Sequence, residues 1–504
     1  MKPLKDLAGQ TTVYGLPSIV GRSLSYLLVP LYTYTFATGE YGKITYIYAY
    51  ISFINIILTY GMETSLFNFS RLEENKKKVY STILLSVSAS SAFFLIVFYL
   101  FRQPIANFAL IGNHPEYITW LALILCSDAV SAIVFAKLRQ LNKARIFAII
   151  KTLNILIYIS CNLFFILLCP AVCKNPDGFL SPFIHAVYNP SIGIGYILIS
   201  NIIASLLTLL MLSPFMVMAG FEFDSALWKR ILPYAMPLIV AGLAGMVNET
   251  LDRVLLQYLL PAEVHWQQGG IYSACYKLSI IITMFVQAFK YAAEPYFFAN
   301  AHEKDFHKTY ADIVKYFVIG CLFISLGTLA NLSWLKHFVG PAYWSGIKIV
   351  PILLLANVCL GVFYTLSIWY KLIHKTIYGA ILTFFGAAIT IALNVYWIPK
   401  IGYMGSAWAT LICYAACMIA CYLWSRKYFP VKFDLTRIGI YFALSLILYF
   451  LSVRIVLDSK LLSLIVNNSL ILIFVAVVFF MEKPTFALLD ELKIKRKDES
   501  ENCK

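Results

Sequence analysis

The stretch that decides the fold is residues 80–101, YSTILLSVSASSAFFLIVFYLF, which contains no charged side chain. A helix needs about 20 mostly apolar residues to cross the hydrocarbon of a bilayer. Backbone N–H and C=O groups have no water to bond in that layer, so a stretch of this kind must satisfy them internally as a helix. We therefore expect a transmembrane helix here.

Thirteen further stretches have the same character. The chain of 504 residues is 61% hydrophobic and 13% charged, with a mean hydropathy of +0.77, whereas soluble domains are about half apolar and a quarter charged. The sequence predicts an all-α polytopic membrane protein with about 14 transmembrane helices. The other predicted spans are 11–35, 44–67, 117–137, 147–169, 191–217, 231–259, 270–292, 313–333, 346–370, 376–397, 403–424, 438–454 and 462–482.

The Lys and Arg residues gather in alternate connections between these spans. With the N-terminus inside, about 29 of the 40 fall on the cytoplasmic side and about eight on the outer side, as the positive-inside rule requires. We expect both termini in the cytoplasm. The net charge of +15 then reflects membrane orientation and contact with anionic headgroups, and no nucleic-acid partner is expected.

A weak internal repeat relates the two halves of the chain. Gly42 precedes Tyr48 by six residues at the second span, and Gly270 precedes Tyr276 by six residues at the eighth. Six spans of equal orientation in each half indicate a parallel duplication, with the site between the halves. We predict two pseudo-symmetric six-helix lobes plus two C-terminal helices. The boundaries are 1–218 for the N-terminal lobe, 228–426 for the C-terminal lobe, 437–482 for the two additional helices and 483–504 for a basic cytoplasmic tail.

Charged side chains lie inside several predicted spans, where an arginine or lysine costs about 2.5–3.5 kcal/mol. Arg22 falls near the middle of the first span, on a polar face with Ser18 and Ser25. Arg253 and Lys277 fall in the outer halves of the seventh and eighth spans, at similar depth. Such cations normally face a cavity or a partner. We predict a cationic cavity between the lobes that binds an anionic group such as a pyrophosphate.

Acidic residues in these spans leave other interpretations open. Glu249 stands four residues before Arg253 and could neutralise it, and Asp252 could pair with Lys277 across neighbouring helices. Glu249 and Asp252 are the predicted charge partners of the cavity. Asp128 and Glu63 are the candidates for coupling to an ion. Asp128 could instead bond to a nearby hydroxyl such as that of Ser131.

Other chemistries have little support in the sequence. Most of the 11 cysteines lie in apolar stretches as small buried side chains, and a disulfide between Cys169 and Cys173 stays open. There is no Cys-x-x-Cys pair with zinc spacing and no nucleotide-binding Gly-x-x-x-x-Gly-Lys-[Ser/Thr] loop. We expect no metal, no cofactor and no enzymatic activity. Met1–Gln10 is too short and polar to form a cleavable signal peptide.

In the order and spacing of its spans, the chain resembles the polysaccharide transporters, that is, the O-antigen flippases and their relatives in the multidrug/oligosaccharidyl-lipid/polysaccharide flippase superfamily. The resemblance implies a two-lobed protein of the bacterial inner membrane that moves an undecaprenyl-diphosphate-linked oligosaccharide to the outer leaflet. It implies a headgroup-binding role for Arg253, in the matching Asp-Arg motif, and for Arg22 and Lys277. The local motifs that carry it are Gly39-Glu40-Tyr41-Gly42, Leu251-Asp252-Arg253, Gly270-Ile271-Tyr272-Ser273 through Lys277, and Ile401 through Thr410.

The hypothesis is therefore an alternating-access flippase for an O-antigen, capsule or exopolysaccharide repeat unit. Its partners would be the lipid-linked oligosaccharide, membrane lipids, and the polysaccharide polymerase and glycosyltransferases of the same pathway. One rival is a multidrug/cation antiporter of the same fold, which would prefer an acidic pocket. Another is a peptidoglycan precursor flippase, which shares a cationic cavity. A glycan polymerase or ligase would need a large outer loop with catalytic basic residues, and the longest, about 170–190, has only Lys174 as a lysine or arginine.

Overall fold

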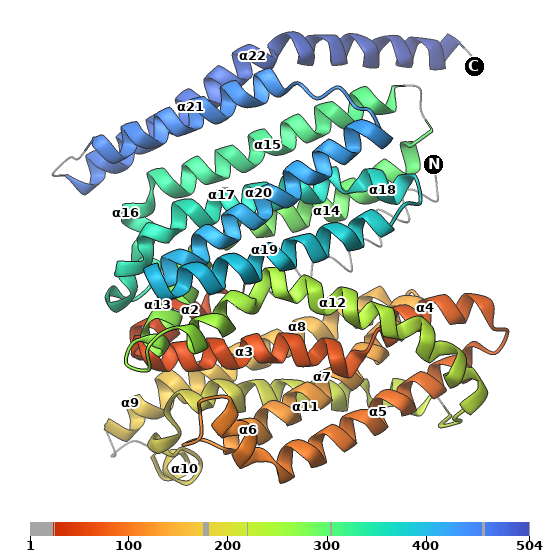
Figure 1. Ribbon diagram of the computed structural model, residues 1–504, viewed down its shortest axis with the longest axis vertical. Coiled ribbons are helices and arrows are strands. Elements are labelled where there is room, and N and C mark those ends of the chain that lie inside the picture. The colour runs from red at the N-terminus through yellow and green to blue at the C-terminus, as the bar shows by residue number, and fades with distance from the viewer. Residues whose placement is uncertain are drawn as a thin grey trace.

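The computed structural model describes residues 24, 26–174, 181–218, 220–302, 305–455 and 459–502, and every regular element within them is a helix (Figure 1). The first half contains α2 (Leu28–Thr35), α3 (Thr38–Thr59), α4 (Met62–Leu72), α5 (Lys76–Leu100), α6 (Arg102–Phe108), α7 (Glu116–Gln140), α8 (Ala144–Leu163), η1 (Phe164–Leu168), α9 (Cys169–Lys174), α10 (Ser181–Val187), η2 (Pro190–Gly195) and α11 (Tyr196–Val217). The second half contains α12 (Ser225–Leu259), α13 (His265–Leu278), α14 (Ile280–Asn300), α15 (Phe306–Ala330), α16 (Leu332–Leu335), η3 (Lys336–Phe338), η4 (Pro341–Ile349), α17 (Val350–Leu366), α18 (Ile368–Leu372), α19 (Ile377–Ile401), α20 (Tyr403–Tyr428), α21 (Leu435–Arg454) and α22 (Lys460–Asn502).

Within the described part of the chain, 12 helices are long and apolar enough to cross a membrane. The count rises to 13 if α13 and α14, which are bent by 50° at Ser279, together form one span. The first predicted span, 11–35, lies mostly outside the described residues. The predicted fold class, an all-α polytopic membrane protein, is confirmed, and the count of fourteen stays a prediction.

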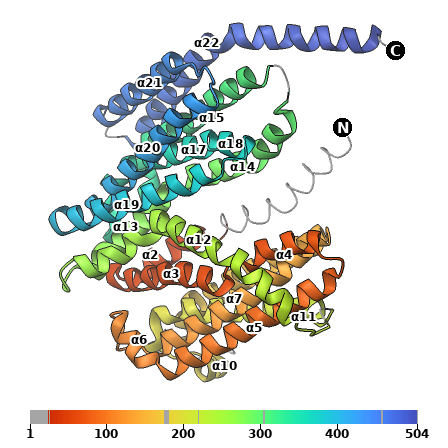
Figure 2. The same cartoon turned by 45° about the vertical axis from the view of Figure 1, so that its right-hand side comes forward.

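The helices form two groups in both views (Figures 1 and 2). The first helix group is α2–α11 and the second is α14–α20, with α12 and α13 between them. The additional helices α21 and α22 pack against α15. We call the end that carries the connections 73–75 and 373–376 the inner end, because the charge count predicts it to be cytoplasmic. The opposite end, with α6, α10 and α16, is the outer end.

The inner half of α12 is fastened to the first helix group. Its N-cap residue Asp224 accepts hydrogen bonds from the first turn of α12 and forms an ion pair with Lys78 of α5 at 2.8 Å. The hydrogen bond from Lys78 holds the pKa of the Asp224 carboxyl below its usual value. Arg230 of α12 forms a second ion pair, with Glu73, at 2.8 Å. This end of α12 is therefore held against the end of α4 and the start of α5.

Further along, α12 is fastened to the second helix group instead. The Asn248 amide donates to the Thr383 carbonyl oxygen of α19 at 3.0 Å, and the Tyr414 hydroxyl of α20 donates to the Asn248 carbonyl oxygen at 3.2 Å. Pro233 and Pro237 lie between the two regions, and a proline inside a helix removes a backbone hydrogen bond. Helix α12 therefore joins the two groups across a weakened segment.

At the outer end the two halves are in direct contact. Helix α3 crosses α13 where Gly42 meets Gly270, close enough for backbone to touch backbone. Beside this crossing, the Gly340 amide donates to the Thr33 hydroxyl at 3.0 Å, which joins η4 to α2. The described conformation is closed between the halves at this end.

Candidate functional site

Arg253 lies on α12, near the outer end of that helix, and is half-buried. Its guanidinium stands over the Tyr276 ring of α13, 4.7 Å from the ring centroid. One guanidinium nitrogen donates to the Glu249 carbonyl oxygen at 3.3 Å. That bond goes to the backbone and not to the carboxylate, and Arg253 forms no ion pair with any residue that the structure describes. Among the described residues, most of the guanidinium N–H donors therefore have no acceptor.

The neighbouring acid, Asp252, points to a different partner. Its carboxylate accepts a hydrogen bond from the Tyr272 hydroxyl of α13 and another, at 2.8 Å, from the backbone amide of Arg253. Both Asp252 and Tyr272 are buried. Asp252 therefore fixes α12 against α13, which is a structural task.

Lys277 lies in the last turn of α13, just before the bend at Ser279, and is half-buried. Neither ion pair considered from the sequence forms: Lys277 is not paired with Asp252, and the exposed Glu249 carboxylate is not paired with Arg253. Lys277 is close enough to Arg253 for the two positive charges to repel each other. Two cations within the membrane span thus share one region without an ion-paired acid among the described residues.

The other predicted ligands cannot be placed. Ser18, Arg22 and Ser25 lie outside the described residues. The two cysteines that flank the outer connection, Cys169 and Cys173, are both free thiols.

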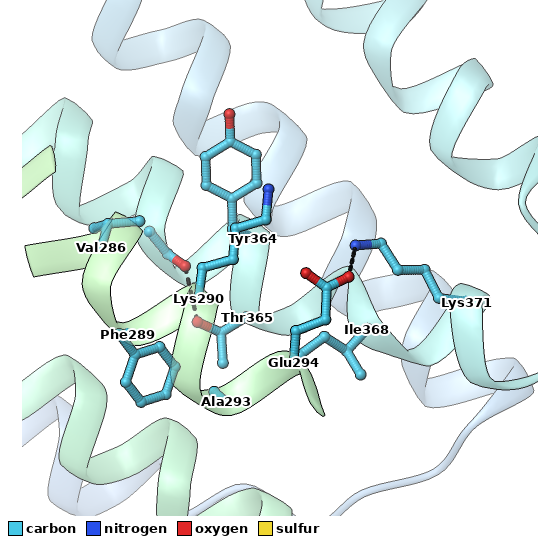
Figure 3. Close-up of a pocket in the computed structure, with 10 residues that line it drawn as sticks. Val286, Phe289, Lys290, Ala293, Glu294, Tyr364, Thr365, Ile368 and Lys371 are labelled. Atoms are coloured by element: carbon cyan, nitrogen blue, oxygen red, sulfur yellow. Dashed lines mark hydrogen bonds and ion pairs between the residues drawn. The ribbon is translucent and has the colours of Figure 1, made fainter. Parts of the chain in front are cut away.

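The structure adds charged residues that the sequence analysis missed, at the inner end of the second helix group (Figure 3). A narrow cleft between α14, α17 and α18 is lined by Lys290, Glu294, Tyr364 and Lys371. Lys290 stands over the Tyr364 ring, 4.9 Å from the centroid, and Glu294 forms an ion pair with Lys371 at 2.6 Å. Lys290 has no ion pair of its own among the described residues. The available signal was the spacing of four between Lys290 and Glu294, at the end of the predicted span 270–292.

The first helix group carries a matching ion pair. Glu63, at the start of α4, pairs with Arg139 at the end of α7 at 2.6 Å. In each half, an acid in or just after the second predicted span therefore pairs with a base just after the fourth, as Glu294 does with Lys371. The correspondence is what a duplicated chain would produce. The Glu63 carboxylate is therefore already ion-paired, with Arg139.

Asp128 lies in the middle of α7 and carries no ion pair with a described residue. Its carboxylate accepts a hydrogen bond from the Ser205 hydroxyl of α11 at 2.7 Å. A hydroxyl partner was expected, but it is Ser205 and not the example Ser131, whose buried hydroxyl has no hydrogen-bond partner among the described residues. The positive charge of Lys151 of α8 acts on Asp128, and the Lys151 ammonium lies 4.4 Å from the Phe135 ring centroid. Asp128 is thus a carboxylate inside a helix group, away from Arg253 and Lys277.

Comparisons with known proteins complete these observations. The sequence profile of a family described as polysaccharide biosynthesis protein matches residues 7–300. No curated protein sequence matches the chain. Within the described residues, no three His, Cys, Asp or Glu side chains come together as a metal site would require.

Three solved structures illustrate the fold. The lipid II flippase MurJ in its inward closed conformation has a TM-score of 0.73 and 15% identity, over 92% of this chain and 98% of that chain. The Vibrio cholerae MATE transporter VcmN in the bent form has a TM-score of 0.55 and 13% identity, over 85% of this chain and 98% of that chain. An outward-facing multidrug resistance MATE family transporter of the MOP superfamily has a TM-score of 0.56 and 12% identity, over 86% and 96%. At these identities the likeness shows the fold alone.

Proposed function

The chain belongs to the polysaccharide biosynthesis protein family, and on this premise we propose that it is a flippase for an undecaprenyl-diphosphate-linked oligosaccharide. The cargo would be the repeat unit of an O-antigen, capsule or exopolysaccharide, moved across the bacterial inner membrane by alternating access. The observation that carries the proposal is the pair of cations, Arg253 and Lys277, without an ion-paired acid among the described residues.

A diphosphate is the cargo group that this arrangement favours. Each cation inside a span costs about 2.5–3.5 kcal/mol unless a cavity or a partner compensates it. Of the two neighbouring acids, Asp252 is bonded to Tyr272, and Glu249 forms no ion pair with either cation. Arginine binds phosphate oxygens through two parallel N–H donors, and lysine adds a compact charge. The Tyr276 ring, which lies under the Arg253 guanidinium, holds that planar group in one orientation. Arg22, with Ser18 and Ser25, would contribute from the first span.

Lys290 would add a third cation to Arg253 and Lys277, nearer the inner end. It follows Lys277 along the bent span α13–α14, and its ammonium is held by the Tyr364 ring instead of an acid. A headgroup that enters from the cytoplasm would meet Lys290 before Lys277 and Arg253. The closed crossing of Gly42 and Gly270 at the outer end fits a conformation that receives cargo from the inside.

Coupling to an ion, if the transport cycle uses one, is assigned to Asp128. Its carboxylate has a single side-chain hydrogen-bond donor and no ion pair among the described residues, so it can exchange a proton or a cation. Glu63, the other candidate, is neutralised by Arg139. A binding event at Asp128 would bias two conformations of similar free energy.

The rivals differ in measurable ways. The peptidoglycan precursor flippase is favoured by the fold of the lipid II flippase, which matches over 98% of its length, and its cargo would share the diphosphate. A multidrug/cation antiporter has the same fold, but would prefer an acidic pocket to the cations Arg253 and Lys277.

Complementation tests these functions side by side. The gene is expressed in a strain that lacks its O-antigen flippase, in a strain depleted of its lipid II flippase, and in a strain without its main drug pumps. We expect restored surface glycan in the first strain only. Rescue of cell-wall synthesis, or proton- or sodium-coupled efflux of cationic dyes without surface glycan, would replace the proposal by the corresponding rival.

A further inference from the structure

A buried carboxylate joins the additional helices to the second helix group at the inner end. Glu482 of α22 is fully buried. It accepts hydrogen bonds from Lys315 at 2.7 Å and Tyr316 at 3.1 Å, both on α15, and from Arg437 at 3.2 Å and Tyr441 at 2.7 Å, both on α21. A buried charge is tolerated when it is paired and fully hydrogen-bonded. Glu482 thus fixes three helices to one another and leaves Lys315 fully engaged.

A cavity of about 420 Å³ lies directly beside this cluster. Its volume is in the range of small-molecule sites, about 300–1,000 Å³. The first two turns of α15 form one wall and the connection between α20 and α21 forms the other. The lining residues are His307, Lys308, Ala311, Asp312, Lys315, Pro430, Lys432 and Asp434.

The charges in this cavity do not balance. Asp312 lies 3.5 Å from the Lys315 ammonium, and Asp434 lies 3.3 Å from the Arg437 guanidinium, so these two carboxylates share their bases with Glu482. Lys308 and Lys432 line opposite walls, and neither forms an ion pair within the described part of the chain. Lys308 and Lys432 therefore add two ammonium groups, from two different elements, to a cluster in which three acids share two bases, and the formal net charge of the cavity and the cluster together is +1.

We propose that this cavity binds the phosphate group of an anionic phospholipid in the cytoplasmic leaflet. Lysine ammonium groups are good phosphate ligands, and the cytoplasmic leaflet concentrates anionic headgroups near basic side chains. The cavity also lies at the start of α15, where the positive end of the helix dipole favours a negative charge. A phosphate bound by Lys308 and Lys432 bridges α15 to the α20–α21 connection, next to the Glu482 cluster. Lipid binding then stabilises the attachment of α21 and α22, independently of any cargo.

The test compares lipids and lysines in the purified full-length protein. Thermal unfolding is followed in phosphatidylcholine vesicles, in vesicles with added phosphatidylglycerol, and in phosphatidylcholine vesicles with inorganic phosphate. The variant Lys308→Gln/Lys432→Gln is compared with Lys77→Gln/Lys229→Gln. These control lysines are exposed, lie at the inner end of α5 and α12, and change the net charge equally.

Phosphatidylglycerol is expected to raise the unfolding temperature of the wild type and of the control. The cavity variant should bind this lipid roughly tenfold more weakly, so it should need about tenfold more phosphatidylglycerol for the same rise in unfolding temperature. Lys308→Arg/Lys432→Arg should keep the response, which separates charge from folding defects. Equal responses of the cavity and control variants would overturn the proposal. So would full stabilisation by inorganic phosphate with no further gain from phosphatidylglycerol, since the ligand would then be a soluble phosphate.

Discussion

Gly42 of α3 and Gly270 of α13 contact each other reciprocally at the outer end of the molecule. A Cβ atom on Gly42 would stand 3.0 Å from the Gly270 amide nitrogen, and a Cβ atom on Gly270 would stand 3.0 Å from the Gly42 amide nitrogen. Each would also collide with the carbonyl oxygen four residues before the other glycine, Trp266 and Thr38 respectively. The contact has the two-fold character of the sequence repeat, and only glycine fits on either side.

Substitution of either glycine should therefore open this contact. Gly42→Ala and Gly270→Ala each place a methyl group against backbone, which cannot move as a side chain can. We expect a loss of about 1–3 kcal/mol from the stability of this conformation. Thermal unfolding of the purified protein should show it, together with reduced surface glycan. Gly327→Ala is the matched control, because its Cβ would meet nothing within 4 Å, and an equal loss in that variant would remove the special role of the crossing.

Arg253→Lys tests whether the guanidinium acts through its shape. Lysine keeps the charge but loses the two parallel donors and the planar contact with Tyr276. We expect glycan export between that of the wild type and that of Arg253→Ala, with normal amounts of each protein in the membrane. Export by Arg253→Lys equal to wild type would reduce the role of Arg253 to charge alone.

The ion pair between Glu294 and Lys371 should be exchangeable, whereas Lys290 should not. Glu294→Lys leaves three positive charges in the cleft, Lys371→Glu leaves two negative charges there, and both single variants should reduce export. The double variant Glu294→Lys/Lys371→Glu restores the pair and should recover most of it. Lys290→Gln, which breaks no ion pair among the described residues, should lower export if this lysine meets the headgroup. Wild-type export by Lys290→Gln would exclude that role.

Asp128 should govern the response to an ion gradient. Asp128→Asn can still accept the Ser205 hydrogen bond but cannot bind or release a proton. In vesicles with an imposed gradient, we expect transport by this variant to become insensitive to the gradient or to stop. Ser131→Ala should behave as the wild type, because the Ser131 hydroxyl does not contact Asp128. A gradient response of Asp128→Asn equal to that of the wild type would end its coupling role.

The transmembrane helices could be predicted because a chain in hydrocarbon must satisfy its backbone hydrogen bonds as a helix. Bends within a span and contacts between helices could not be predicted from the sequence. The composition of residues 80–101 is enough to predict α5. The bend at Ser279 is not marked by a proline or a glycine in the sequence, and it divides a predicted single span into α13 and α14. The repeat predicted that Gly42 and Gly270 are equivalent. It could not predict that equivalent residues touch.

In the candidate site, the sequence likewise reveals single residues but not their contacts. Arg253 and Lys277 could be found because a cation is conspicuous in an apolar stretch. The hydrogen-bond donor to Asp128 could not be found, because the sequence shows only which residues are close along the chain. Ser131 is three residues from Asp128, whereas the true donor Ser205 is 77 residues away. Lys371 lies in a connection by sequence, and its pairing with Glu294 exists only in the folded chain.

The most direct test of the account is the affinity of the purified protein for a lipid-linked diphosphate oligosaccharide. Wild type, Arg253→Ala/Lys277→Ala and the charge-matched Lys77→Ala/Lys229→Ala are compared, each also with the lipid monophosphate. A hydrogen bond to a charged group contributes about 1.5–3 kcal/mol, so loss of the two cations should weaken binding of the diphosphate by roughly 10–100-fold or more. The control should bind as the wild type does. Unchanged affinity in Arg253→Ala/Lys277→Ala would contradict the claim that these cations bind a diphosphate.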